Sequence, residues 1–192
     1  HPAMPQRKGI EEEILKGMYL LKAGEKGDKK VQLMGSGVIL NEVIKGAELL
    51  KNDFGVDADI WSVPSFNLLH RDAIEVERYN RLHPLEEAKL PFVTRQLQGY
   101  EGPVIASTDY IRSFADRIRA YIPNDYHVLG TDGFGRSDSR ANLRDFFEVD
   151  SRHVAVAALS ALAEQGKVGK EVVQQAIEKY GIQTDTAPSW KR

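Results

Sequence analysis

The stretch Val31-Gln-Leu-Met-Gly-Ser-Gly-Val38 decides the fold, because it joins a short apolar run to the start of a helical pattern. Val31 to Met34 is typical of a strand, and the glycines that follow interrupt it. From Val38 to Asn52 apolar residues recur at every third or fourth position, which predicts an amphipathic helix. A strand followed at once by a helix is the first half of a βαβ unit.

The same alternation continues along the chain. Apolar runs bounded by turn residues predict further strands over 58–63, 103–106 and 126–129, and a short edge strand over Pro91–Thr94. Helical periodicity predicts helices over 9–21, 65–79, 108–121, from Ser139, from Ser151 and around 172–180. The fold class is therefore α/β: a single domain with a mostly parallel sheet of about five strands flanked by helices, and with C-terminal helices. We place an N-terminal segment with one helix at residues 1–29 and the α/β domain at residues 30–192.

Composition excludes several classes of function. The chain has 192 residues, a net charge of −2 and no cysteine, which argues against nucleic-acid partners, disulfides and thiol catalysis. No apolar run approaches the ~20 residues that cross a bilayer, and no apolar stretch marks a signal peptide after His1. We expect a cytoplasmic protein without a membrane partner. The first residue is not methionine, and we expect a piece of a longer protein.

Three familiar site patterns are incomplete. Gly35-Ser-Gly37 stands where a dinucleotide fold has its glycine loop, but the third glycine position is Leu40 and the second strand ends without an acid. A tight strand-to-helix turn is the favoured interpretation. The five histidines have no metal-ligand spacing, and no Gly-x-Ser-x-Gly elbow is present, so we predict neither a metal site nor a serine hydrolase.

The most concentrated polar loop is Gly130-Thr-Asp-Gly-Phe-Gly-Arg-Ser-Asp-Ser-Arg140. It follows a predicted strand and precedes a helix, so it belongs at the carboxyl edge of the sheet, where ligands usually bind. The arginines suit a carboxylate or phosphate. Equally, the acids and serines suit caps of backbone amides, with the arginines in surface ion pairs, and the spacing does not choose between the two. The candidate interface or channel residues are Thr131, Asp132, Phe134, Arg136, Ser137, Asp138 and Arg140.

Three stretches of the chain resemble a known family. Ala106-Ser-Thr-Asp-Tyr110, the run from Tyr126 to Arg140, and His83-Pro-Leu-Glu86 are similar to the C-terminal domain of homodimeric bacterial pyruvate dehydrogenase, the decarboxylating component. The resemblance extends from about Ala3 to Gly181. More loosely, the pattern from Gly130 to Ser137 resembles the last domain of transketolases.

The resemblance implies a parent enzyme that uses thiamine diphosphate and Mg²⁺, decarboxylates pyruvate and acetylates the lipoyl group of a dihydrolipoyl acyltransferase partner. In that family a Gly-Asp-Gly…Asn signature of another domain holds the coenzyme. This chain has Gly27-Asp-Lys29 and Thr131-Asp-Gly133 instead, so no coenzyme ligand or catalytic residue carries over. We therefore expect an isolated chain to be inactive and to serve structure and the dimer interface. The alternative is a self-contained nucleotide- or anion-binding α/β module.

Overall fold

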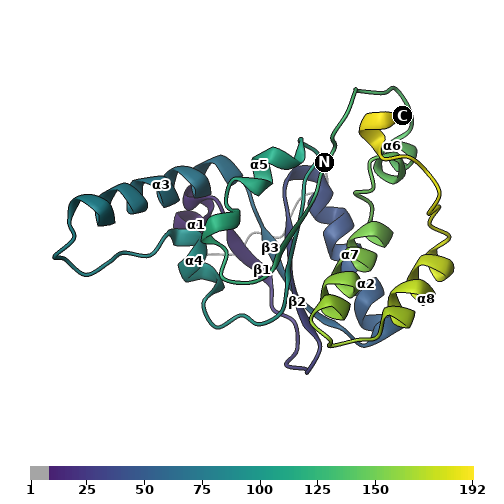
Figure 1. Cartoon of the computed structure of the whole chain (residues 1–192), viewed down its shortest axis with the longest axis horizontal. Helices are drawn as coiled ribbons and strands as arrows, with labels where there is room; N and C mark the ends of the chain where they lie inside the picture. Colours follow the sequence, from purple (N-terminus) through teal and green to yellow (C-terminus); the bar gives the residue numbers. More distant parts are fainter. Residues whose placement is uncertain (1–8) are drawn as a thin grey trace.

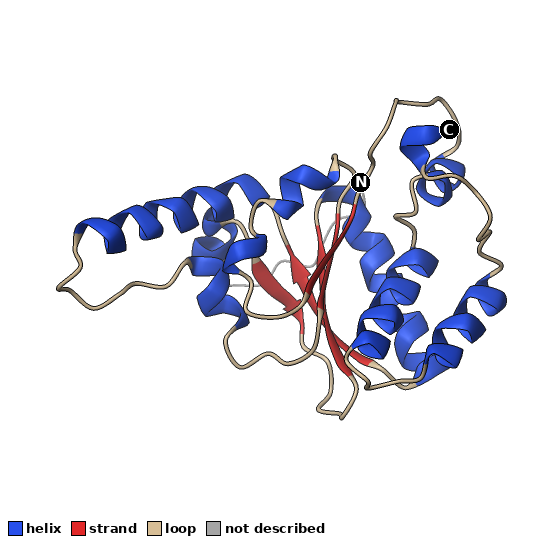
Figure 2. Ribbon diagram, viewed as in Figure 1, coloured by secondary structure: helices blue, strands red, loops and turns tan. Residues whose placement is uncertain are grey.

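The computed structural model describes residues 9–192, and a five-stranded sheet lies at their centre (Figure 2). The strand order is β1-β3-β2-β4-β5, with β2, β3, β4 and β5 parallel and β1 antiparallel to β3. The strands are β1 (Tyr19–Lys22), β2 (Lys30–Gly35), β3 (Asp57–Ser62), β4 (Val104–Ser107) and β5 (Tyr126–Leu129). The prediction of one mostly parallel sheet of about five strands is confirmed.

Helices cover both faces of this sheet (Figure 1). The α-helices are α1 (Glu11–Lys16), α2 (Leu40–Phe54), α3 (Phe66–Leu82), α4 (Phe92–Leu97), α5 (Arg112–Asp116), α6 (Arg140–Phe146), α7 (Ser151–Glu164) and α8 (Lys170–Tyr180). Short 3-10 turns complete the chain: η1 (Gly37–Ile39), η2 (Arg119–Tyr121) and η3 (Ser189–Lys191). Helices α2, α7 and α8 lie on one face, and α3, α4 and α5 on the other (Figure 1).

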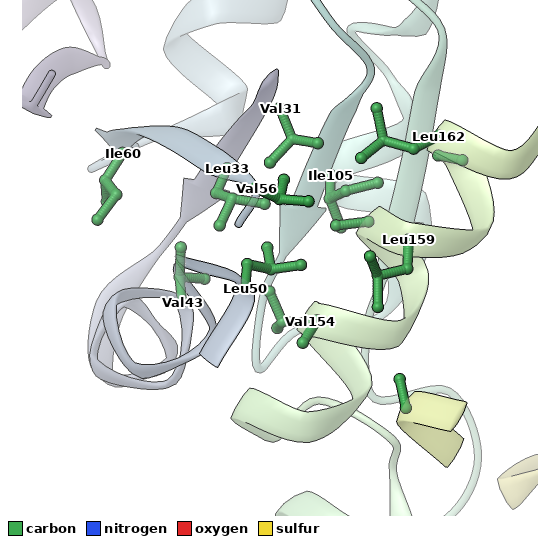
Figure 3. Packing of buried hydrophobic residues seen from close by; sticks show 14 of the residues in the cluster. Val31, Leu33, Val43, Leu50, Val56, Ile60, Ile105, Val154, Leu159 and Leu162 are labelled. Atoms are coloured by element: carbon green, nitrogen blue, oxygen red, sulfur yellow. The ribbon is translucent and has the colours of Figure 1, made fainter. Parts of the chain in front are cut away.

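Alternation along the strands divides the buried residues between the two faces. Leu33 of β2 and Ile105 of β4 pack with α2 and α7, whereas Met34 and Ala106, one residue further on, pack on the opposite side. Figure 3 shows the first cluster, with Leu50 of α2 and the apolar side of α7 meeting over the strands. Because both faces of the parallel sheet are buried, large apolar side chains occur at both alternating sets of strand positions.

Close packing of α2 on α7 depends on one glycine. A Cβ atom built on Gly46 would lie 2.9 Å from Cγ1 of Val154, so a larger residue would push the helices apart. In α7 the residues Val154, Ala155, Ala158, Leu159, Ala161 and Leu162 are buried. The predicted deep burial of this helix is confirmed.

Two predicted elements near the ends of the sheet are wrong. The helix expected over 9–21 stops at Lys16, because Gly17 adopts a φ of 105° and the chain turns into β1. There Tyr19 pairs with Ser62, which supplies the antiparallel edge strand. The edge strand expected over Pro91–Thr94 is instead the start of α4, whose Phe92, Val93 and Leu97 are buried against the α3 side of the sheet.

The remaining elements follow the predicted order with small changes of length. The helix expected over 108–121 is shorter and divides into α5 and η2. The division at residue 29 stays a prediction, although β1, on its N-terminal side, is hydrogen-bonded into the sheet. The predicted absence of a signal peptide and the start of the resemblance at Ala3 fall on residues 1–8, outside the described part of the chain.

Candidate functional site

The parallel strands end in register at one edge of the sheet. Gly35 pairs with Ser62 and with Ser107, and Ser107 pairs with Leu129. The segments that follow these four strands therefore leave the sheet at the same edge. This is the edge at which open α/β sheets usually bind ligands.

The turn after β2 meets the turn after β4 at the centre of this edge. The Ser36 and Thr108 hydroxyls are hydrogen-bonded at 3.0 Å. A Cβ atom on Gly35 would lie 2.8 Å from Cα of Leu40, so this glycine allows the helix to pack directly on the strand end. The predicted tight strand-to-helix turn is confirmed.

The loop after β5, Gly130–Arg140, is tied to the segment after β4 by its first residues. Thr131 donates its backbone N–H to the carbonyl oxygen of Tyr110 at 2.9 Å and its hydroxyl to that of Asp109 at 2.7 Å. The Asp132 carboxylate accepts the backbone N–H of Arg112 at 2.9 Å. These bonds fix where the loop starts, so its later residues extend from an ordered base.

The middle of the loop faces solvent. Gly133 has a φ of 117°, which favours glycine, whereas Gly135 has an ordinary φ and open space around its Cβ position. Phe134 is 87% exposed. The Arg136 guanidinium lies over the ring of Phe146 at 4.3 Å from its centroid, so within this chain it makes a cation–π contact.

The end of the loop caps α6. The hydroxyl of Ser139 accepts the backbone N–H of Asn142 at 3.2 Å, as an N-cap residue does. Asp138 accepts from the Asn142 side chain at 2.8 Å and from the Ser139 backbone at 2.6 Å. These hydrogen bonds, first that from Asn142, lower the pKa of Asp138 below its usual value. Asp138 and Ser139 are therefore structural caps.

The C-terminal turn η3 holds the loop from the other side. The hydroxyl of Ser189 donates to the carbonyl oxygen of Asp132 at 2.6 Å, and a Cβ atom on Gly133 would lie 3.2 Å from Cα of Trp190. Arg192 lies over the ring of Phe146 at 4.6 Å, so two arginines contact the same ring. The loop is thus held by the segment after β4, by α6 and by the C-terminal turn together.

A cavity of about 320 Å³ opens beside this loop. The apolar part of its lining comes from Val38 and Ile39 of η1, from Leu143 of α6, and from Phe147 and Val149 after that helix. Its polar groups include Arg136, Arg140 and Asp109. The cavity is lined by Val38, Ile39, Asp109, Thr131, Gly133, Gly135, Arg136, Arg140, Leu143, Arg144, Phe147 and Val149.

The arginines that line the cavity differ in whether their side chains have a partner within the chain. Arg144 donates to the buried carboxylate of Glu42 at 2.7 Å, and Glu42 also accepts the backbone N–H of Ser151 at 3.1 Å. The side chain of Arg140 makes no hydrogen bond or ion pair with any other residue between 9 and 192. Arg140 is therefore the guanidinium available to an external carboxylate or phosphate.

One carboxylate–histidine cluster lies nearby, between the end of α6 and the start of α7. Asp145, Asp150 and His153 each place a ligand atom within 4.8 Å of the others. However, Arg152 donates to Asp145 at 2.5 Å and to Asp150 at 2.6 Å, and Asp150 caps α7. Burial raises the pKa of Asp150, but hydrogen bonds from His153 and Arg152 outweigh it and hold that pKa well below its usual range. A guanidinium already compensates these acids, so the cluster does not fit a cation.

The structure thus brings some of the predicted site residues together and separates others. Thr131, Arg136 and Arg140 line the cavity, Asp132 and Asp138 fix the loop, and Phe134 and Ser137 face solvent. Arg144 and Ser189 were not predicted from the sequence. Arg144 stood within a predicted helix with no signal of its ion pair, and Ser189 lies 57 positions from Asp132.

None of the helices described between residues 9 and 192 combines the length and apolar character needed to span a bilayer.

Comparison with protein families identifies one match that covers most of the chain. A family described as the transketolase-like TK C-terminal domain matches residues 17–150. Among solved structures, transketolase from Pichia stipitis with sedoheptulose 7-phosphate is similar over 81% of this chain and 19% of its own, with a TM-score of 0.53 and 18% identity. Transketolase from Campylobacter jejuni is similar over 77% and 19%, with a TM-score of 0.51 and 20% identity. These structures support the fold.

Closer similarity is found among characterised sequences. The pyruvate dehydrogenase E1 component of Pseudomonas aeruginosa is 58% identical over 183 residues, or 94% of this chain. The E1 component of Escherichia coli K12 is 51% identical over 185 residues, or 96% of this chain. In both cases the match covers 20% of the relative, so the chain spans about a fifth of their length.

Proposed function

The chain belongs to the transketolase-like C-terminal domain family, and on that basis we propose that it acts as the C-terminal domain of a thiamine diphosphate-dependent pyruvate dehydrogenase. The observation that carries the proposal is the 58% identity over 94% of the chain to a pyruvate dehydrogenase E1 component. The enzyme would decarboxylate pyruvate and pass the acetyl group to the lipoyl group of a dihydrolipoyl acyltransferase. We propose a cytoplasmic homodimer.

Within that enzyme we assign the coenzyme and Mg²⁺ to other parts of the polypeptide. Mg²⁺ takes several oxygen ligands in an octahedral set. The cavity beside the loop offers one carboxylate, Asp109, and the cluster around Asp150 is already compensated by Arg152. Neither of these two places therefore fits a metal-bound diphosphate, and we propose that the 192-residue chain alone does not turn over pyruvate.

The contribution of this chain is then positional. We propose that the Gly130–Arg140 loop and its cavity contact a neighbouring part of the enzyme at the interface or the substrate channel. The loop is fixed at its base by Thr131 and Asp132 and at its end by Ser139, so it presents Phe134 and Arg140 in a defined place. An ordered loop loses little conformational entropy when it meets its partner.

The second candidate is binding of a free anion. The specific observation in its favour is Arg140, whose side chain lines a cavity with both apolar and polar residues and has no acidic partner among residues 9–192. A small molecule with one carboxylate or phosphate and an apolar part would suit this cavity. A nucleotide suits it less well, because Gly35 is used for packing on Leu40 and does not form a phosphate loop.

The test is the substitution Arg140→Ala in the full-length enzyme, with Lys170→Ala on α8 as the matched exposed control. Loss of a charge-assisted hydrogen bond costs about 1.5–3 kcal/mol, so turnover or dimer affinity should fall at least tenfold. The melting temperature should change little, because Arg140 is exposed. Steady-state kinetics and dimer dissociation are measured beside thermal unfolding.

Arg136→Ala and Asp132→Asn extend this test. Arg136 stacks on Phe146 and Asp132 anchors the loop, so these variants should disturb the loop itself. Unchanged turnover and dimer affinity in all three variants would leave the loop as a structural cap of α6 and contradict its proposed role.

A further inference from the structure

Helix α3 leaves the body of the molecule before it ends. Its buried residues Phe66, Leu69 and Ala73 all lie in its first eight positions. Every residue from 74 to 91 is exposed or half-buried, and we call this segment the arm. Figure 1 shows α3 reaching away from the sheet and the following loop returning beside it. The second half of the helix therefore packs little against the body of the domain.

The arm is nevertheless ordered by its own contacts. The Asn80 side chain donates to the backbone oxygen of Lys89 and accepts from its backbone nitrogen, both at 2.9 Å. The Tyr79 ring stacks on His83 at 4.0 Å, and the Lys89 ammonium lies 3.3 Å from the centre of the Tyr79 ring. The Tyr79 hydroxyl also donates to Glu86. An arm ordered in advance pays a smaller entropic cost when it docks.

Charges on α3 are segregated between its two sides. The acids Asp72 and Glu77 face the body: Asp72 accepts the backbone N–H of Phe92 at 2.6 Å, and Glu77 accepts the hydroxyl of Tyr121 at 2.8 Å. In contrast, Arg71, Arg78 and Arg81 are exposed and make no ion pair with any residue from 9 to 192. The two acids on the inner side are thus hydrogen-bonded within the chain, whereas the three arginines on the outer side have no ion-pair partner among residues 9–192.

These arginines share their side of the helix with apolar residues. At 100° per residue, they fall with Leu68, Ile74 and Leu82 in a sector of about 140°. Leu68 is 40% exposed, Ile74 42% and Leu82 54%. The outer face of α3 is defined by Leu68, Arg71, Ile74, Arg78, Arg81 and Leu82. Glu75 is the one acid in the same sector.

We propose that the outer face of α3 docks onto an acidic, partly apolar surface in the remaining part of the longer enzyme polypeptide. The proposal rests on the proposed function, in which this chain is about a fifth of that polypeptide. Arginine is enriched at protein interfaces, and the buried centre of an interface is more apolar than the rest of the protein surface. No residue of α3 after Ala73 is buried, so docking would add packing to the contacts that already order the arm.

The experiment measures amide hydrogen exchange over residues 74–91 in the full-length enzyme. In the wild type these amides should be protected, and the double variant Arg71→Glu/Arg78→Glu should exchange them at least tenfold faster. The control Lys167→Glu/Lys170→Glu reverses the charge of two exposed lysines near the start of α8. It should leave the hydrogen exchange of the arm unchanged. Amides of α7 report whether the domain itself stays folded.

Each outcome decides the proposal. Equal exchange of the arm in the wild type and the arginine variant overturns it, because the arginines of the outer face would then make no contact that protects the arm. Protection that appears only after the lipoyl-bearing acyltransferase is added also overturns it and assigns the outer face to that partner. Pyruvate turnover is measured separately, so an inactive enzyme with a protected arm would count against the proposed function and not against docking.

Discussion

Helices α7 and α3 are similar in length but have opposite surroundings. Six of the fourteen residues of α7 are buried, and they are spread over most of its length. Only three of the seventeen residues of α3 are buried, and all of them lie near its start. The comparison indicates that the body of the domain packs on α7 along most of its length, whereas it packs on α3 mainly near its start.

The largest expected difference concerns buried leucine. Leu159 of α7 is fully buried and Leu82 of α3 is 54% exposed. Leu159→Ala should lower the free energy of unfolding by about 3 kcal/mol, through lost burial and a residual cavity, and Leu82→Ala by no more than about 0.5 kcal/mol. Urea unfolding followed by circular dichroism measures both. Equal losses of unfolding free energy in the two variants would show that the arm contributes as much to the stability of the domain as α7.

Removal of the two helix caps should lower the free energy of unfolding by amounts that differ less than those of the two leucine substitutions. Asp150 caps α7 and binds Arg152 and His153, while Ser65 caps α3 through a single bond to the backbone N–H of Leu68 at 3.2 Å. Asp150→Ala should cost about 2 kcal/mol and Ser65→Ala about 1 kcal/mol or less.

The stabilisation by the two caps should also differ in its dependence on pH. The pKa of Asp150 is lowered in the folded chain, so its stabilisation is complete above the unfolded value of 3.8 and is lost as pH falls through the folded value. The cost of Asp150→Ala should therefore shrink in acid, and the cost of Ser65→Ala should not. Urea unfolding at pH 7 and at progressively lower pH measures the change, and a constant cost of Asp150→Ala would contradict the assigned pKa.

The smallest global effect is expected in the arm. Asn80→Ala removes two hydrogen bonds to Lys89, but the surrounding backbone is exposed. The free energy of unfolding should change by about 0.5 kcal/mol or less. Limited proteolysis between residues 83 and 90 should nevertheless become faster, since the returning loop loses its attachment. An unchanged rate of cleavage there would show that Tyr79 alone orders the arm.

Periodicity alone predicted the parallel core of this fold. The four parallel strands have apolar runs closed by turn residues, and α2 and α8 have regular apolar stripes, so local patterns were sufficient. The edge elements were different. Gly17 ends α1 and lies so close to the backbone of α3 that a Cβ atom would be 2.7 Å from the carbonyl oxygen of Ser65. That contact is tertiary, and no local pattern indicates it.

The candidate site likewise contains features that local sequence predicts and contacts that only the fold brings about. Ser139 was predictable as the residue that opens α6, because capping depends on neighbours in sequence. The partners of Arg136 and Asp132 were not, because Phe146 and Ser189 reach them only through the fold. Sequence reasoning therefore placed the loop at the correct edge of the sheet but could not decide which of its side chains were already engaged.

The attachment of η3 to the loop also has an optical consequence. The chain has two tryptophans: Trp61 is 1% exposed and hydrogen-bonded to Gln32, whereas Trp190 is 51% exposed and lies against Gly133. Their fluorescence should therefore separate into a blue component from the core and a red component from the edge of the sheet. The difference between the spectra of the wild type and Trp190→Phe isolates the red component. Its wavelength and quenching then record the state of the Gly130–Arg140 loop without any added dye.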